Sequence, residues 1–188
     1  MAASAYDFSI DGICYNVVSK TRLAVEVTFR SNEYKSYAGE ITLPETVQWN
    51  NQTYTVERIG NNAFKRCVNL ESITLPEGLR TIGSDAFYSC TGLRTIIIPD
   101  SVKSIGMGSF GDCSKLTVAR FGTSLERVGM YAFNECVSLE SVALPATMVY
   151  IGEYAFSDCS ALKSASFPSS AEVESNSFQG TKAKISTY

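Results

Sequence analysis

The chain has 188 residues, of which 45% are hydrophobic and 19% charged, and its formal net charge is −3. This composition is typical of a globular domain rather than a disordered chain, and the weak negative charge argues against nucleic acid as a partner. No apolar run approaches the roughly 20 residues of a transmembrane segment, and the absence of histidine excludes Ser-His and Cys-His nucleophile pairs.

The first 58 residues do not repeat, and their patterns predict β-strands and hairpins. FSIDGICYNVV carries Asp11-Gly12 between apolar alternations, which is a strong signal for a type I′ hairpin. RLAVEVTF alternates apolar and polar residues and predicts a strand. TVQWNNQTYTV predicts a second hairpin around Asn50-Asn51, and Leu43-Pro44 is expected to end the first strand of a longer ladder. The aromatic residues of this region are expected to be packed inside it: Tyr34, Tyr37, Trp49 and Tyr54.

From residue 59 onwards the sequence repeats itself. The five clearest copies start 23 residues apart: IGNNAFKRC at Ile59, IGSDAFYSC at Ile82, IGMGSFGDC at Ile105, VGMYAFNEC at Val128 and IGEYAFSDC at Ile151. A sixth and weaker copy, VESNSF, starts at Val173 after a step of 22 residues. Self-similarity at a fixed period of this length indicates a stacked repeat array, in which neighbouring units bury a continuous core.

Each repeat has the same internal order of residue types. Cys, Phe and Leu recur at fixed positions, and a short apolar/polar alternation follows each Leu and ends at Pro or, once, at Gly122. The alternation predicts a half-buried strand, which proline then terminates. The Gly after each Ile or Val indicates either a positive φ or a close backbone approach. We expect a unit of strand, turn, Ile-Gly segment, one-turn helical piece carrying Ala-Phe, and return through Cys and Leu.

The pattern LxxIxLP…IGxxAFxxC resembles the BspA-like leucine-rich repeats, a family found on surface proteins of oral and gut bacteria and of some protozoan parasites. The resemblance covers residues 59–181, and YAGEITLPETVQWNNQTYTVERIG is similar to the segment that precedes the first full repeat in that family. It implies an α/β repeat fold, namely a right-handed leucine-rich-repeat solenoid with a parallel β-sheet on its concave face. Several residues depart from the pattern and should pack less well: Ser109, Ala119, Gly122, Ala165, Glu174, Ser177 and Thr181.

These patterns divide the chain into three parts. Residues 1–58 form a β-hairpin N-terminal cap with the first ladder strand, because the end of a solenoid core needs cover. Residues 59–181 form the leucine-rich repeats. Residues 182–188 form a C-terminal closing segment with a short strand around Ile185, although the cut edge of a longer protein is the alternative.

The cysteines and carboxylates are weak candidates for chemistry. One Cys per 23 residues is the wrong spacing for a zinc site, and stacked rungs about 4.8 Å apart do not match disulfide geometry, so buried reduced thiols and no metal or cofactor are expected. The four recurring acidic residues are expected on a solvated outer turn, without a catalytic site: Asp85, Asp112, Glu135 and Asp158. The protein is therefore not expected to be an enzyme.

The residues that flank the buried strand positions are the candidate binding face. They should point into the concave surface, where solenoids commonly bind. They are Ser72, Thr74, Thr95, Ile97, Val118, Arg120, Ser141, Ala143, Ser164 and Ser166. Only Ile97 and Arg120 among them have the character of anchor residues.

The resemblance implies a non-catalytic protein-binding module, on the cell surface or secreted, that takes part in adhesion to a host or microbial surface protein. The alternative is an intracellular protein-interaction scaffold in the cytoplasm. The N-terminal residues MAASAYDFSIDG have neither the basic nor the apolar region of a signal peptide, which fits a trimmed or mature chain as well as a cytoplasmic one. Exposed terminal strands allow either a monomer or an end-to-end dimer.

Overall fold

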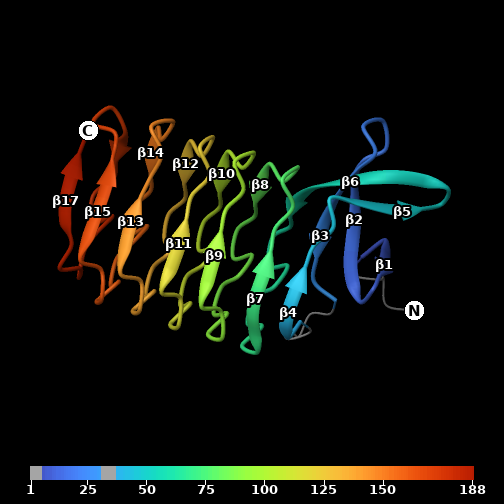
Figure 1. The fold of residues 1–188 in the computed structure, drawn as a ribbon, viewed down its shortest axis with the longest axis horizontal. Helices are drawn as coiled ribbons and strands as arrows, with labels where there is room; N and C mark the ends of the chain where they lie inside the picture. The colour runs from blue at the N-terminus through green and yellow to red at the C-terminus, as the bar shows by residue number, and fades with distance from the viewer. Residues whose placement is uncertain (1–5, 31–36) are drawn as a thin grey trace.

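A computed structural model describes residues 6–30 and 37–188, and in it the chain winds into a β-solenoid whose rungs lie side by side (Figure 1). The N-terminal strands are β1 (Phe8–Ile10), β2 (Ile13–Ser19), β3 (Ala24–Thr28), β4 (Gly39–Thr42), β5 (Thr46–Trp49) and β6 (Gln52–Ile59). The strands of the repeats are β7 (Leu70–Thr74), β8 (Thr81–Ile82), β9 (Thr95–Ile97), β10 (Ser104–Ile105), β11 (Val118–Arg120), β12 (Arg127–Val128), β13 (Ser141–Ala143), β14 (Tyr150–Ile151), β15 (Ser164–Phe167), β16 (Glu172–Val173) and β17 (Lys184–Thr187).

Two sets of parallel strands run the length of the solenoid. The proline-side strands, named for the residue that follows most of them, are β4, β7, β9, β11, β13, β15 and β17. The glycine-side strands are β6, β8, β10, β12, β14 and β16, and they form one continuous sheet with β1, β2 and β3. Neighbouring glycine-side strands pair one repeat apart, as Ser104 does with both Thr81 and Arg127. The 23-residue period of the sequence is therefore the length of one rung.

The N-terminal hairpins form where the sequence predicts them. β1 and β2 meet at Asp11-Gly12, and β5 and β6 meet at Asn50-Asn51. Both central residues of each turn have positive φ, between 49° and 80°, as a type I′ turn requires. β3 then pairs in parallel with β6, so this region extends the glycine-side sheet at one end of the array (Figure 1).

Aromatic residues fill the space beneath the N-terminal hairpins. Tyr37 and Tyr54 are buried, and the ring of Trp49 stacks on Phe8 with 4.6 Å between centroids. Tyr37 also donates a hydrogen bond to the backbone oxygen of Thr28 at 2.8 Å, which ties this segment to β3. The expectation that these side chains pack inside is confirmed for these three residues, whereas Tyr34 lies outside the described residues.

A stack of phenylalanines runs through the centre of the solenoid. Five of the six rings are fully buried, and adjacent centroids lie 4.9–5.3 Å apart in nearly parallel planes. The ladder consists of Phe64, Phe87, Phe110, Phe133, Phe156 and Phe178. Leu and Cys ladders lie in the same core cluster, which extends into the N-terminal strands. The core is therefore continuous along the array, as stacking of incomplete units demands.

The recurring glycines are required by close approach between rungs. Gly60, Gly83, Gly106, Gly129 and Gly152 have no positive φ. A Cβ on Gly106 would lie 2.7 Å from the backbone nitrogen of Ser84 and 2.8 Å from the carbonyl carbon of Gly83. Of the two reasons that the sequence left open for these glycines, the structure supports the steric one.

The prediction of a one-turn helical piece, and with it the α/β label for the repeat, is wrong, because the described residues contain no helix and the Ala-Phe segment consists of turns. Its backbone amides alternate between two kinds of bond. Ala63 N–H donates within the turn to Gly60, whereas Phe64 N–H donates to Ala86 of the next rung at 2.7 Å. Two residues per repeat also have positive φ, as Asn62 and Arg66 do in the first copy. Left-handed residues four positions apart prevent a right-handed helix from propagating.

Two of the residues that depart from the repeat pattern are better accommodated than the sequence suggests. Ser109 and Ser177 replace the small Ala before the core Phe, and both are buried. The Ser109 hydroxyl lies 2.8 Å from the carbonyl oxygen of Gly83 and 2.7 Å from that of Gly106. Ser177 makes the equivalent contacts with Gly152 and Glu174. Their hydroxyls therefore have partners, and these positions are not defects in the core.

Candidate functional site

The ten residues singled out from the sequence all lie on the proline-side strands. In β9, β11 and β13 the central residue is buried and both neighbours are exposed, so the alternation expected from the sequence is present. β7 and β15 follow the same pattern, except that Ser166 is only half-buried rather than exposed. We call the surface formed by these ten side chains the proline-side face.

Strand register brings the two anchor candidates together. In the parallel pair of β9 and β11, Ile97 is the partner of Arg120, and Thr95 is the partner of Val118. Ile97 is 58% exposed and Val118 is 40% exposed, which is unusual for aliphatic side chains. The centre of the proline-side face is therefore an exposed aliphatic pair beside one guanidinium group.

The proline-side sheet is interrupted on both sides of this pair. β9 bonds to β11 but neither strand belongs to the same ladder as β7 or β13. A hollow of about 780 Å³ lies between β11 and β13, and its lining includes Val118, Arg120, Ser141 and Ala143. A second hollow of about 300 Å³ lies between β7 and β9, and Ser72, Thr74, Thr95 and Ile97 contribute to its walls.

These hollows were not predictable from the alternation of residues along the strands, although the sequence contains one signal for the larger of them. The larger hollow is also lined by Ala119 and Phe121, in the repeat where Ala replaces the usual Ile and Gly122 replaces Pro. A smaller inward side chain leaves space below the strand. The departure from the repeat pattern thus coincides with the larger of the two hollows.

Charge on the proline-side face is sparse. Glu140 also lines the larger hollow, and its carboxylate is paired with Lys163 at 3.2 Å. Within residues 6–30 and 37–188, no carboxylate lies within ion-pair distance of Arg120. Arg120 therefore presents an uncompensated positive charge at the edge of the hollow.

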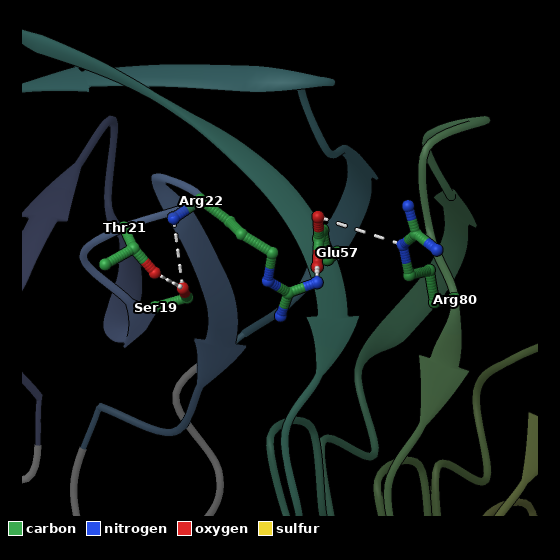
Figure 2. Close-up of polar contacts among 5 residues, drawn as sticks. All are labelled: Ser19, Thr21, Arg22, Glu57 and Arg80. Atoms are coloured by element: carbon green, nitrogen blue, oxygen red, sulfur yellow. Dashed lines mark hydrogen bonds and ion pairs between the residues drawn. The ribbon is translucent and has the colours of Figure 1, made fainter.

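A second cluster of charges joins the N-terminal hairpin to the repeats. Figure 2 shows Glu57 of β6 between Arg22, from the β2–β3 turn, and Arg80, which precedes β8. The Glu57 carboxylate lies 3.3 Å from Arg22 and 3.8 Å from Arg80, and the residue is 8% exposed. The two guanidinium groups offset the charge of the buried carboxylate, so this cluster links the N-terminal hairpin to the repeats.

The six cysteines form no disulfide and all are buried. Four of the ladder thiols donate a hydrogen bond to a Phe carbonyl oxygen of the previous rung, as Cys113 Sγ does to Phe87 at 3.2 Å. Burial raises the pKa of Cys113 to about 12 and raises the pKa of Cys90 and Cys136 well above the ordinary value. The expectation that the ladder cysteines are buried is confirmed.

The raised pKa values of these thiols predict that the protein loses stability at alkaline pH. We expect the free energy of unfolding to fall as pH rises from about 8.5, where thiols of the unfolded chain ionise, because the folded chain keeps the Cys113 thiol protonated up to a pKa of about 12. Urea unfolding midpoints measured between pH 7 and pH 11 test this, with Cys113→Ala as the control that should show a shallower decline. A midpoint that does not change with pH would contradict the prediction.

The recurring carboxylates do not converge on a reaction centre. Asp85 pairs with Lys65 at 2.8 Å, and Asp112 accepts a hydrogen bond from Ser89 at 2.8 Å, so these two are half-buried in contacts along the turns. Glu135 and Asp158 are exposed, as expected for a solvated edge. In the part of the chain that the structure describes, no group of three or more His, Cys, Asp or Glu residues could hold a metal ion, and no helix could span a membrane.

Comparison with known proteins identifies the repeat family and solved structures with a similar fold. The sequence profile of the BspA type leucine rich repeat region matches six copies, over residues 31–146 and 57–185. Among solved structures, a leucine rich cell surface protein from Faecalibacterium prausnitzii A2-165 superposes with a TM-score of 0.82 at 26% identity, covering 98% of this chain and 51% of that one. No curated protein sequence gives a significant match.

Two further structures have the same architecture. The T. pallidum leucine rich repeat protein TpLRR is 30% identical, with a TM-score of 0.74, and the match covers 85% of this chain and 70% of that one. A leucine-rich repeat protein from Bacteroides ovatus ATCC 8483 is 29% identical, with a TM-score of 0.67, over 96% of this chain and 53% of that one. The chain spans about half the length of the F. prausnitzii and B. ovatus proteins.

Proposed function

The chain belongs to the BspA-type leucine-rich repeat family, and on that premise we propose that it is a non-catalytic protein-binding module that acts in adhesion at a bacterial cell surface. The family indicates a protein-interaction module. The observation that carries the proposal is the proline-side face, where two hollows flank the exposed Ile97 and Val118 beside Arg120. Arg is enriched among the residues that anchor protein interfaces, and the exposed aliphatic side chains beside Arg120 supply apolar surface that a partner can bury.

A surface or secreted location is the finer part of the proposal. It rests on the F. prausnitzii relative, which is described as a cell surface protein. The free cysteines favour an intracellular scaffold only weakly, because all six thiols are buried and would stay reduced even in an oxidising environment. The surface role is therefore preferred to the scaffold role.

The test is a binding panel with the purified chain on defined ligands: fibronectin, laminin, fibrinogen and collagen, together with fixed host cells. The informative variant carries Ile97→Glu and Arg120→Glu, which place two negative charges on the proline-side face. A matched control carries Val68→Glu and Val137→Glu, which alter two Val side chains of similar exposure, 44% and 42%, outside that face.

Binding that is lost in the face variant and kept in the control variant would support the proposed function. Binding that survives in the face variant would contradict the assignment of the proline-side face. The absence of binding across the whole panel would contradict the adhesion role. Circular dichroism and thermal unfolding of both variants establish that each is folded before its binding is compared.

A further inference from the structure

Arg120 is electrostatically isolated on its face. The positions one rung apart in its row carry no charge other than its own: Thr42, Thr74, Ile97, Arg120, Ala143, Ser166 and Ser186. The nearest acidic residue in the same hollow, Glu140, is already bound to Lys163. A guanidinium group with five donors and no anionic partner among residues 6–30 and 37–188 is suited to receive a carboxylate from another molecule.

Val118 and Ile97 form an exposed aliphatic surface, here called the aliphatic shelf, at a fixed spacing from the Arg120 guanidinium group. Val118 precedes Arg120 by two residues on β11, so both side chains point from the same side of the strand, about 6.6 Å apart along it. Ile97 lies beside Arg120 on β9 and completes the shelf. The hollow of about 780 Å³ next to them is large enough for side chains of a bound segment.

We propose that this part of the proline-side face binds an extended acidic peptide in which an apolar residue and an Asp or Glu lie two positions apart. In an extended segment, residues i and i+2 point to the same side, with the same spacing as Val118 and Arg120. The carboxylate pairs with Arg120 while the apolar side chain rests on Val118 and Ile97. This inference deepens the proposed function and rests on it, because it names the chemistry of the partner at the same face.

An acidic oligosaccharide is the other class of molecule that carries carboxylates. Sugar rings are usually held by stacking on aromatic faces. The ten side chains of the proline-side face include no aromatic residue, and Phe121, which lines the larger hollow, packs edge-to-face with the core ring of Phe133. Aliphatic side chains favour an aliphatic partner through burial of apolar surface. The composition of the shelf therefore favours a peptide.

The experiment is a phage-display selection in which random peptides are tested for binding to the folded wild-type chain. The peptides that are retained are then sequenced. Selected peptides are then synthesised, and their affinities are measured by fluorescence anisotropy with the wild type, Arg120→Gln, Ile97→Ser and Arg127→Gln. Arg127 is the matched control, because it is an exposed Arg on the glycine side, stacked over Tyr150. Sialyllactose and a hyaluronan oligosaccharide are the probes for the alternative class.

We expect enrichment of an apolar residue two positions from Asp or Glu. Arg120→Gln should weaken binding by about tenfold or more, as for loss of a charge-assisted hydrogen bond. Ile97→Ser should weaken it about threefold to tenfold, and Arg127→Gln should leave it unchanged. Weaker binding at high salt is expected as well.

Three outcomes would overturn the inference. They are selection without any retained sequence, retained peptides whose affinity is the same for wild type and Arg120→Gln, and oligosaccharide binding that depends on Arg120 in place of peptide binding. Retained neutral peptides that lose affinity in Ile97→Ser would leave the proposed protein-binding face standing while refuting the acidic partner. The two proposals can therefore fail separately.

Discussion

Replacing Phe110 by Ala is expected to destabilise the protein by about 3–5 kcal/mol. The Phe110 ring is fully buried in the middle of the array, with ring centroids 5.0 Å from both Phe87 and Phe133. Its removal costs the transfer free energy of the ring and leaves a cavity that the stacked neighbours on both sides cannot fill. Chemical unfolding followed by circular dichroism measures the loss.

The matched control for Phe110→Ala is Val149→Ala, since Val149 is 53% exposed and has no place in the core. Its effect should stay within about 0.5 kcal/mol, as is usual for surface substitutions. For a chain of this size, the difference corresponds to a melting temperature lower by roughly 6–20 °C in Phe110→Ala. A loss of less than about 1 kcal/mol in Phe110→Ala, below the range for buried aromatic rings, would show that the Phe ladder does not carry the core.

Replacing Gly106 by Ala is the second substitution with a large expected effect. A Cβ at this position would lie 2.7 Å from the Ser84 nitrogen and 2.8 Å from the Gly83 carbonyl carbon, which are backbone atoms and cannot swing away. The rungs would have to move apart, and the hydrogen bond from Gly106 N–H to the Ile82 oxygen, now 2.8 Å, would stretch. We expect a destabilisation of about 2–3 kcal/mol, near the upper end for overpacking.

Gly78→Ala separates this steric effect from the general properties of alanine. The nearest atom to a Cβ at Gly78 is the Thr55 methyl group at 3.5 Å, which is ordinary van der Waals contact. The stability of this variant should therefore stay within about 1 kcal/mol of the wild type. Equal losses in the two variants, measured by urea unfolding, would refute the role assigned to the Gly106 contact.

The parts of the fold that follow from residue type could be predicted from the sequence. Phe110 and Cys113 recur with their neighbours at a fixed period, and only stacking can bury such ladders. Asp11-Gly12 indicates its turn locally, because both residues tolerate positive φ. The turns around the core Phe could not be predicted in this way, since positive φ also occurs at Arg66 and Glu135, which have no intrinsic preference for it.

The candidate face was predictable as a set of exposed positions and not as a shape. Alternation placed Ile97 and Arg120 on the same surface, and strand register then made them neighbours. The hollows on either side depend on where pairing between proline-side strands is interrupted, which is a property of several rungs together. Ala119 gave a local indication of the larger hollow, but its effect depends on Phe121 and on the next strand.

The parallel stacking of rungs has a mechanical consequence. Hydrogen bonds between rungs run along the axis of the array, so a pull on the two ends loads the interfaces in series and the weakest of them breaks first. Each detached rung would release 23 residues, which extend to roughly 75–80 Å in place of a spacing of about 4.8 Å. Tension would therefore lengthen the molecule in equal steps, one rung at a time. The rungs that are still stacked would stay folded while the released segment extends.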